Sequence, residues 1–126
     1  MATTAFLAST DYGVTDSATP LTLGIVEVPL ATVMLCRVLI MAVRADGAAK
    51  TWTFESAIRR TESALTVLET LPAGLNVFAN AADETALTGV TIALFSDPTF
   101  IGVVCTGQAG QTINWFVTID GKGLSA

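Results

Sequence analysis

Few residues of this 126-residue chain could carry out chemistry. Histidine is absent, so the sequence lacks the most common general base and the most common metal ligand. The two cysteines, Cys36 and Cys105, do not form a CxxC motif of the kind that binds zinc or undergoes redox exchange. The adjacent acidic pair Asp83-Glu84 lies in a polar stretch that is typical of a solvated loop. These residues favour a protein that is not an enzyme.

A glycine-rich segment does not resemble a phosphate-binding loop. Gly107 and Gly110 bracket this segment, but it lacks the lysine and the strand-to-helix context of a P-loop. Aspartates and threonines could ligate calcium, but their spacing does not match that of an EF-hand loop. We therefore predict no catalytic, cofactor-binding or metal-binding residues.

The charge distribution disfavours nucleic-acid and membrane partners. The formal net charge is −5, and the six basic residues are scattered except for the pair Arg59-Arg60. Without a basic patch the chain cannot neutralise a row of phosphates or an anionic membrane surface. Residues 28–43 are very apolar, but they are fewer than the roughly 20 residues that a membrane span requires. Arg37 near the middle of this segment also makes a span unfavourable.

The overall composition indicates a protein that works within an assembly. Hydrophobic residues make up 52% of the chain and charged residues only 13%, about half the usual charged share of roughly 25%. Nineteen threonines provide much of the polar surface. Such a monomer should leave apolar area exposed, and exposed apolar area usually marks an interface. An obligate oligomer, or a protein bound to a larger assembly, is favoured.

The cysteines and the N-terminal residues bear on the cellular compartment. Cys36 and Cys105 lie in apolar runs and read as two small buried hydrophobic residues, although a single disulfide remains an alternative. The first ten residues lack the basic region and the long apolar region of a signal peptide. We therefore expect synthesis in the cytoplasm.

Hydrophobic periodicity predicts one all-β domain over residues 21–126. The expected architecture is an antiparallel β-sandwich or a small, jelly-roll-like β-barrel. Asp46-Gly47 is a turn signal, and the last three apolar runs have the spacing of an antiparallel meander. The predicted strands are residues 21–28, 33–45, 50–57, 90–96, 99–106 and 111–119.

Two segments are less clearly patterned. Residues 1–20 are interrupted by polar residues and glycine, which predicts an extended N-terminal arm. This arm is either a free tail or a segment that docks on a neighbour through Phe6, Leu7 and Tyr12. Residues 55–70 favour a loop followed by a short strand, with a helix as the alternative because apolar residues also recur there at helical spacing.

Alternating apolar residues in two strands predict the core. Trp52 and Phe54 share one face of the strand at 50–57, while Ile113, Trp115 and Val117 share one face of the last strand. Tryptophan in such a strand is most often a core or interface anchor, because its indole buries a large area. These five residues are the predicted core anchors.

The strand at 33–45 is apolar on both faces. One sheet of a sandwich has a single inner face, so the second apolar face needs another cover. We predict that Val38, Ile40 and their neighbours are partly buried between subunits.

The C-terminal strands carry a family resemblance. The sequence TGQAGQTINWFVTI at 106–119 resembles the closing hairpin of small β-rich modules in tailed-bacteriophage virion proteins. VTIALFSDPTFIGVVCTG at 90–107 is similar to the strand pair before that hairpin. KTWTFESAIRRT at 50–61 looks like an upstream strand of such modules. Residues 1–49 carry no resemblance of this kind.

The resemblance implies a structural role in a virion, without catalysis. The first hypothesis is a capsid decoration or cement protein, a homotrimer that binds the major capsid protein on the assembled head and bridges its subunits. A head-fibre, tail-fibre or baseplate module of the same virion is the second. A lectin-like carbohydrate-binding module is the third, and exposed tryptophan or tyrosine along a groove would favour it.

Overall fold

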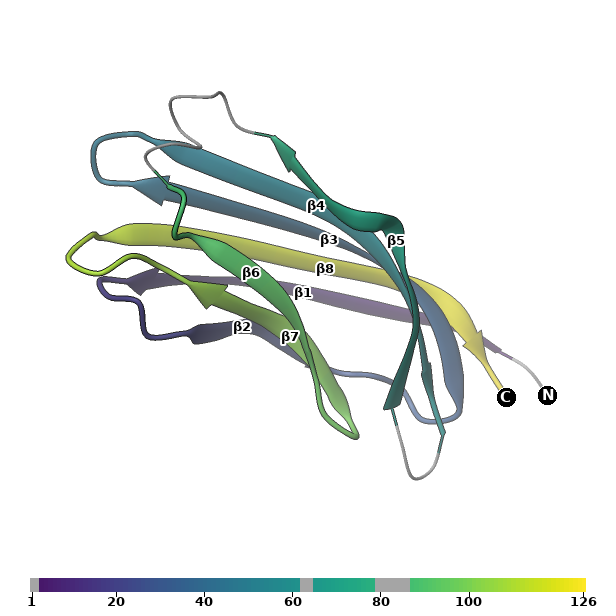
Figure 1. The fold of residues 1–126 in the computed structure, drawn as a ribbon. Coiled ribbons are helices and arrows are strands. Elements are labelled where there is room, and N and C mark those ends of the chain that lie inside the picture. The colour runs from purple at the N-terminus through teal and green to yellow at the C-terminus, as the bar shows by residue number, and fades with distance from the viewer. Residues whose placement is uncertain (1–2, 62–64, 79–86) are drawn as a thin grey trace.

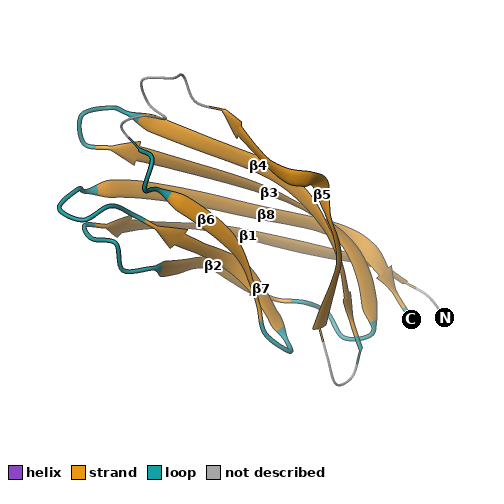
Figure 2. Cartoon of the chain, viewed as in Figure 1, coloured by secondary structure: helices purple, strands orange, loops and turns teal. Residues whose placement is uncertain are grey.

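The chain folds into two antiparallel β-sheets that pack together as a β-sandwich (Figure 1). The computed structural model describes residues 3–61 and 87–126 in full and residues 65–78 as backbone. No helix occurs among these residues, which confirms the all-β prediction (Figure 2). Sheet A has the order β1 (Thr3–Thr15), β8 (Ile113–Ser125), β3 (Thr32–Arg44), β4 (Ala49–Arg60) and β5 (Leu65–Phe78). Sheet B has the order β2 (Leu21–Glu27), β7 (Phe100–Thr106) and β6 (Thr91–Ser96).

The N-terminal arm predicted over residues 1–20 is not confirmed, because most of it is a strand of sheet A. β1 pairs with β8 without interruption from Thr3 opposite Ser125 to Thr15 opposite Ile113. Propensity arguments underestimated this segment, since its threonines favour a strand once a neighbouring strand supplies hydrogen bonds. The single domain therefore begins at or before β1 and not at residue 21.

β1 is also tied to sheet B through side chains. The Asp11 carboxylate accepts a hydrogen bond from the Gly24 backbone N–H (3.0 Å), and the Ser9 hydroxyl donates to the Gly24 carbonyl oxygen (3.1 Å). Gly24 has φ +69° and lies where the β2–β7 register shifts between Leu23 and Val26. This bulge turns the β2 backbone toward β1 and needs a residue that tolerates positive φ.

β3 alternates strictly between the core and the outside. Val38 and Ile40 are fully buried, whereas Leu35 and Met41 are exposed on the opposite face. The expectation that Val38 and Ile40 lie between subunits is therefore wrong. The apolar residues on the two faces could not be told apart by periodicity alone, because a shift of one residue exchanges the faces of a strand.

Two strands occupy the described part of residues 55–70, where the sequence favoured a loop around residues 60–63 followed by a short strand. β4 continues to Arg60 and β5 runs over 14 residues from Leu65 to Phe78, so the alternative helix is excluded for the described residues and the strand is longer than predicted. Part of the predicted loop lies outside the described residues. Glu55 lies opposite Leu71, while Thr53 lies opposite Asn76, which leaves residues 72–75 of β5 as a bulge. Pro72 thus lies in an irregularity of an edge strand, a position where proline is tolerated.

The last three strands do not form the predicted meander. β6 and β7 pair as a hairpin in sheet B, but β8 crosses to sheet A and inserts between β1 and β3. The spacing of the apolar runs predicted the hairpin of β6 and β7 correctly, but it could not show that β8 joins the other sheet. The turn predicted at Asp46-Gly47 does join β3 to β4, with Gly47 at φ +92°.

Removal of residues 1–15 should unfold the domain rather than leave it intact. The deletion strips β8 of one hydrogen-bonded neighbour and removes the buried side chains of Ala5 and Leu7. We expect a loss exceeding that of a single buried leucine truncation, which is about 2–5 kcal/mol. Thermal unfolding followed by circular dichroism measures this, and a truncated protein that melts like the full chain would contradict the role of β1.

Candidate interaction surface

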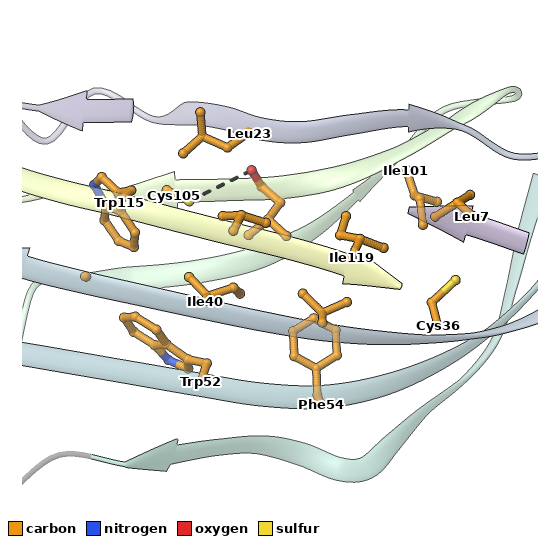
Figure 3. Close-up of a cluster of buried hydrophobic side chains, with 14 of the residues drawn as sticks. Leu7, Leu23, Cys36, Ile40, Trp52, Phe54, Ile101, Cys105, Trp115 and Ile119 are labelled. Atoms are coloured by element: carbon orange, nitrogen blue, oxygen red, sulfur yellow. Dashed lines mark hydrogen bonds between the residues drawn. The ribbon is translucent and has the colours of Figure 1, made fainter. Parts of the chain in front are cut away.

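The five predicted core anchors lie together between the two sheets. Trp52, Phe54, Ile113, Trp115 and Val117 are each no more than 3% exposed. The rings of Trp52 on β4 and Trp115 on β8 stack with centroids 6.0 Å apart and planes 19° apart, across the intervening strand β3 (Figure 3). Such aromatic pairs add stability beyond the area that they bury.

The indole of Trp115 has a specific polar partner. Its Nε1 donates a 2.9 Å hydrogen bond to the Oγ1 atom of Thr15, a side chain that is itself buried. Gly107 passes so close that a Cβ at this position would lie 2.2 Å from Thr15 Oγ1. The glycine therefore leaves room for the hydroxyl that satisfies the buried indole.

The predicted interface residues divide into two groups. Leu7, Val38 and Ile40 are buried in the core of the single chain and are not available to a partner. Phe6 is 68% exposed and Tyr12 is 72% exposed, both on the face of β1 that points away from sheet B. Only Phe6 and Tyr12 are thus placed where a neighbouring molecule could touch them.

The two exposed aromatic residues belong to a larger apolar surface. We define the outer face as the side chains of β1, β8, β3 and β4 that point away from sheet B. Among the fully described residues, eight of the ten exposed large hydrophobic side chains lie on it. They are Phe6, Tyr12, Val14, Val33, Leu35, Met41, Val43 and Leu124.

Strand register arranges the outer face in rows. Tyr12, Phe116 and Met41 are directly opposite one another on β1, β8 and β3, and the Tyr12 and Phe116 rings stack at 6.2 Å. A second row contains Phe6 and Leu35, with Lys122 of β8 between them. Directly opposite residues on one sheet face pack against each other, so the row of Tyr12, Phe116 and Met41 is a continuous apolar stripe across three strands, whereas Lys122 interrupts the row of Phe6 and Leu35.

One row of charged residues crosses the middle of the outer face. Asp120 on β8, Arg37 on β3 and Glu55 on β4 are opposite one another, and Arg37 Nη2 lies 3.0 Å from Glu55 Oε1. A depression of about 540 Å³ lies between this row and the row that contains Phe6, Lys122 and Leu35. The outer face therefore combines exposed apolar side chains with several charged ones, a mixture that occurs in protein interfaces.

The described residues contain no group of three or more His, Cys, Asp or Glu side chains that could hold a metal ion. Cys36 and Cys105 are free and buried, and burial raises the pKa of their thiols to about 11 and about 12. Protonated thiols are poor nucleophiles. Within the described part of the chain, no helix is long and apolar enough to cross a membrane.

Comparison with known proteins adds no relative. No protein-family model matches this chain, and no curated protein is significantly similar to it.

The sequence signal for the outer face was present in β3. Val33, Leu35, Met41 and Val43 stand at every second position except where Arg37 and the half-buried Leu39 intervene. β3 is apolar on both faces in the sequence, but the predicted interface residues Val38 and Ile40 lie on its inner face. The sequence does not show which of the two faces sheet B covers.

Replacement of Trp115 by alanine should lower the free energy of unfolding by about 3–5 kcal/mol, the range for large aromatic residues in a core. The variant loses the ring stack with Trp52 and leaves the Thr15 hydroxyl without its donor. Denaturant unfolding measures the change. Phe116→Ala on the opposite face of β8 is the control and should cost less, because Phe116 is only half-buried. A melting temperature of Trp115→Ala within a degree or two of the wild type would place Trp115 outside the core.

The buried thiols should make the protein lose stability at alkaline pH. Both folded-state pKa values are raised above the ordinary value of 9.0, so their contribution is complete below pH 9 and declines as the pH rises through 11 to 12. A variant with Cys36→Ala and Cys105→Ala should show a flatter stability profile above pH 9 than the wild type. In the native wild type at pH 8, a thiol reagent should react only as fast as the domain opens. Rapid labelling of two thiols without denaturant would refute their burial.

Proposed function

We propose that this protein is a structural component of a tailed-bacteriophage virion, and that it acts as a capsid decoration or cement protein. The observation that carries the proposal is the outer face, on which eight large apolar side chains are exposed. Covering such a face removes apolar area from water. The resemblance of roughly residues 50–120 to phage structural modules is the reason for naming a virion as the assembly that would cover it.

The mechanism of such a protein is mass action. A protein that binds only the assembled shell stabilises it by RT ln(1 + [L]/Kd), about 2.7 kcal/mol per site at a hundredfold excess over Kd. The major capsid protein is the expected partner, and the outer face would span the joint between its subunits. The long hydrogen-bonded strands of sheet A suit this role, because they hold the apolar side chains of the outer face at fixed positions relative to one another.

Two alternative functions compete with this proposal. A head-fibre, tail-fibre or baseplate module would use the outer face in the same way at a different place on the virion. A lectin-like module has less support, because Trp52 and Trp115 are both buried. Tyr12 is exposed but lies among Phe116 and Met41, which offer no hydrogen bonds to sugar hydroxyls.

Labelled protein added to phage particles that lack it should bind over the whole head and raise the temperature at which the shell breaks. Labelling at one pole of the particle would assign the protein to the tail, and no binding to any part of the particle would refute a virion role.

Replacement of Met41 by lysine should weaken particle binding about tenfold or more, because the new charge is desolvated in the middle of the outer face. Leu30→Lys is the matched control. Leu30 is equally exposed but lies in the connection between β2 and β3, so this change should leave binding unaltered. Equal loss in both variants would show that the outer face is not the attachment site.

A further inference from the structure

β1 is an edge strand whose second side is unpaired within the described chain. It pairs with β8 alone, over all 13 residues and without a register shift. Edge strands normally carry proline, lysine or a bulge, which block pairing with another chain. β5, at the other edge of sheet A, carries both Pro72 and a bulge. β1 has neither, and contains no lysine or arginine.

The side chains of β1 are arranged symmetrically about its centre. Phe6 and Tyr12, the two most exposed large apolar residues of the fully described chain, stand three positions before and three positions after Ser9. Ser9 is also the middle residue of the strand, which runs from Thr3 to Thr15. Two features, strand length and aromatic spacing, therefore share one centre.

We propose that β1 pairs with β1 of a second copy of this chain, antiparallel and with a two-fold axis at Ser9. In this register all 13 residues of each strand are paired, and Phe6 stands opposite Tyr12 of the partner subunit. The same contact repeats on the other side of the axis. Cross-strand aromatic pairs of this kind have Cβ atoms about 4.5–5.5 Å apart and stabilise a sheet.

The remaining β1 side chains are compatible with this register. On the outer face the pairs are Thr4 with Val14 and Ala8 with Thr10, so no charges meet across the joint. On the inner side Asp11 would face Leu7, but its carboxylate already accepts hydrogen bonds from the backbone N–H groups of Gly24 and Tyr12. No two side chains of like charge therefore lie opposite each other between the two β1 strands.

The paired molecule would present a doubled outer face. A two-fold axis between antiparallel strands is perpendicular to the sheet, so the two outer faces point in the same direction. The stripe of Met41, Phe116 and Tyr12 would continue into Phe6 of the partner subunit, beyond which its row holds a lysine. If the outer face attaches to a virion, as the proposed function holds, two faces on one rigid unit bind far more tightly than one. The pairing itself does not depend on that function.

The same register makes the proposal testable by exchanging charges. The variant Phe6→Lys/Tyr12→Lys places lysines opposite each other at both contacts and should abolish pairing. Phe6→Lys/Tyr12→Glu places opposite charges there and should restore it. Both positions are well exposed in the single chain, so neither variant disturbs the core. Met41→Lys adds the same charge to the outer face two strands away and is the matched control.

Sedimentation equilibrium of the purified full chain at low micromolar concentration provides the readout. We expect the mass of two chains for the wild type, the control and the Lys/Glu variant, and of one chain for the Lys/Lys variant. Near-ultraviolet circular dichroism of the stacked tryptophans verifies that each is folded. A wild-type mass of one or three chains overturns the proposal, as does a dimeric Lys/Lys variant or a monomeric Lys/Glu variant. Because no particle is present, these failures leave the proposed attachment to a virion untouched, and loss of particle binding leaves the pairing untouched.

Discussion

The pairing of β8 on both of its sides is the interaction on which the rest of the structure depends. β8 lies between β1 and β3 and is in register with both along its length. This position leaves little space: a Cβ at Gly123 would lie 2.1 Å from the backbone oxygen of Val33. The close approach of the strands fixes which side chains point inward, and hence the tryptophan stack and the buried hydrogen bond to Thr15. The apolar outer face follows from the same alternation.

The sequence predicted the class of the fold and most of its strands because those features are local. Alternation marked Trp52, Phe54 and Trp115 as inward-facing, and all three are buried. Threonine-rich β1 escaped detection because its strand character depends on β8, about a hundred residues away. The same limit explains why β8 was assigned to a meander, since spacing between strands does not state which sheet a strand joins.

The sequence predicted that an apolar sheet face would need a cover, but it did not show which residues form that face. Low charge and a doubly apolar β3 indicated that one sheet face would need a cover. Val38 and Ile40 are large apolar residues like Leu35 and Met41, and only sheet B decides which pair is covered within the chain. The predicted homotrimer used Val38 and Ile40 as interface residues. Val38 and Ile40 lie in the core, so the proposals for assembly use the outer face and the unpaired edge of β1 instead.

The distance along the chain between β1 and β8 also affects how the protein folds as it is made. Thr15 and Trp115, which share a buried hydrogen bond, are 100 residues apart. Contacts of such long range are slow to form, and on a ribosome they must wait until the last strand has emerged. Until then β1 and β3 each lack the neighbour that separates them in the folded sheet, and their unpaired edges are open to wrong partners. High concentrations of nascent chains during rapid synthesis would therefore favour aggregation, and a chaperone that shields strand edges would raise the yield.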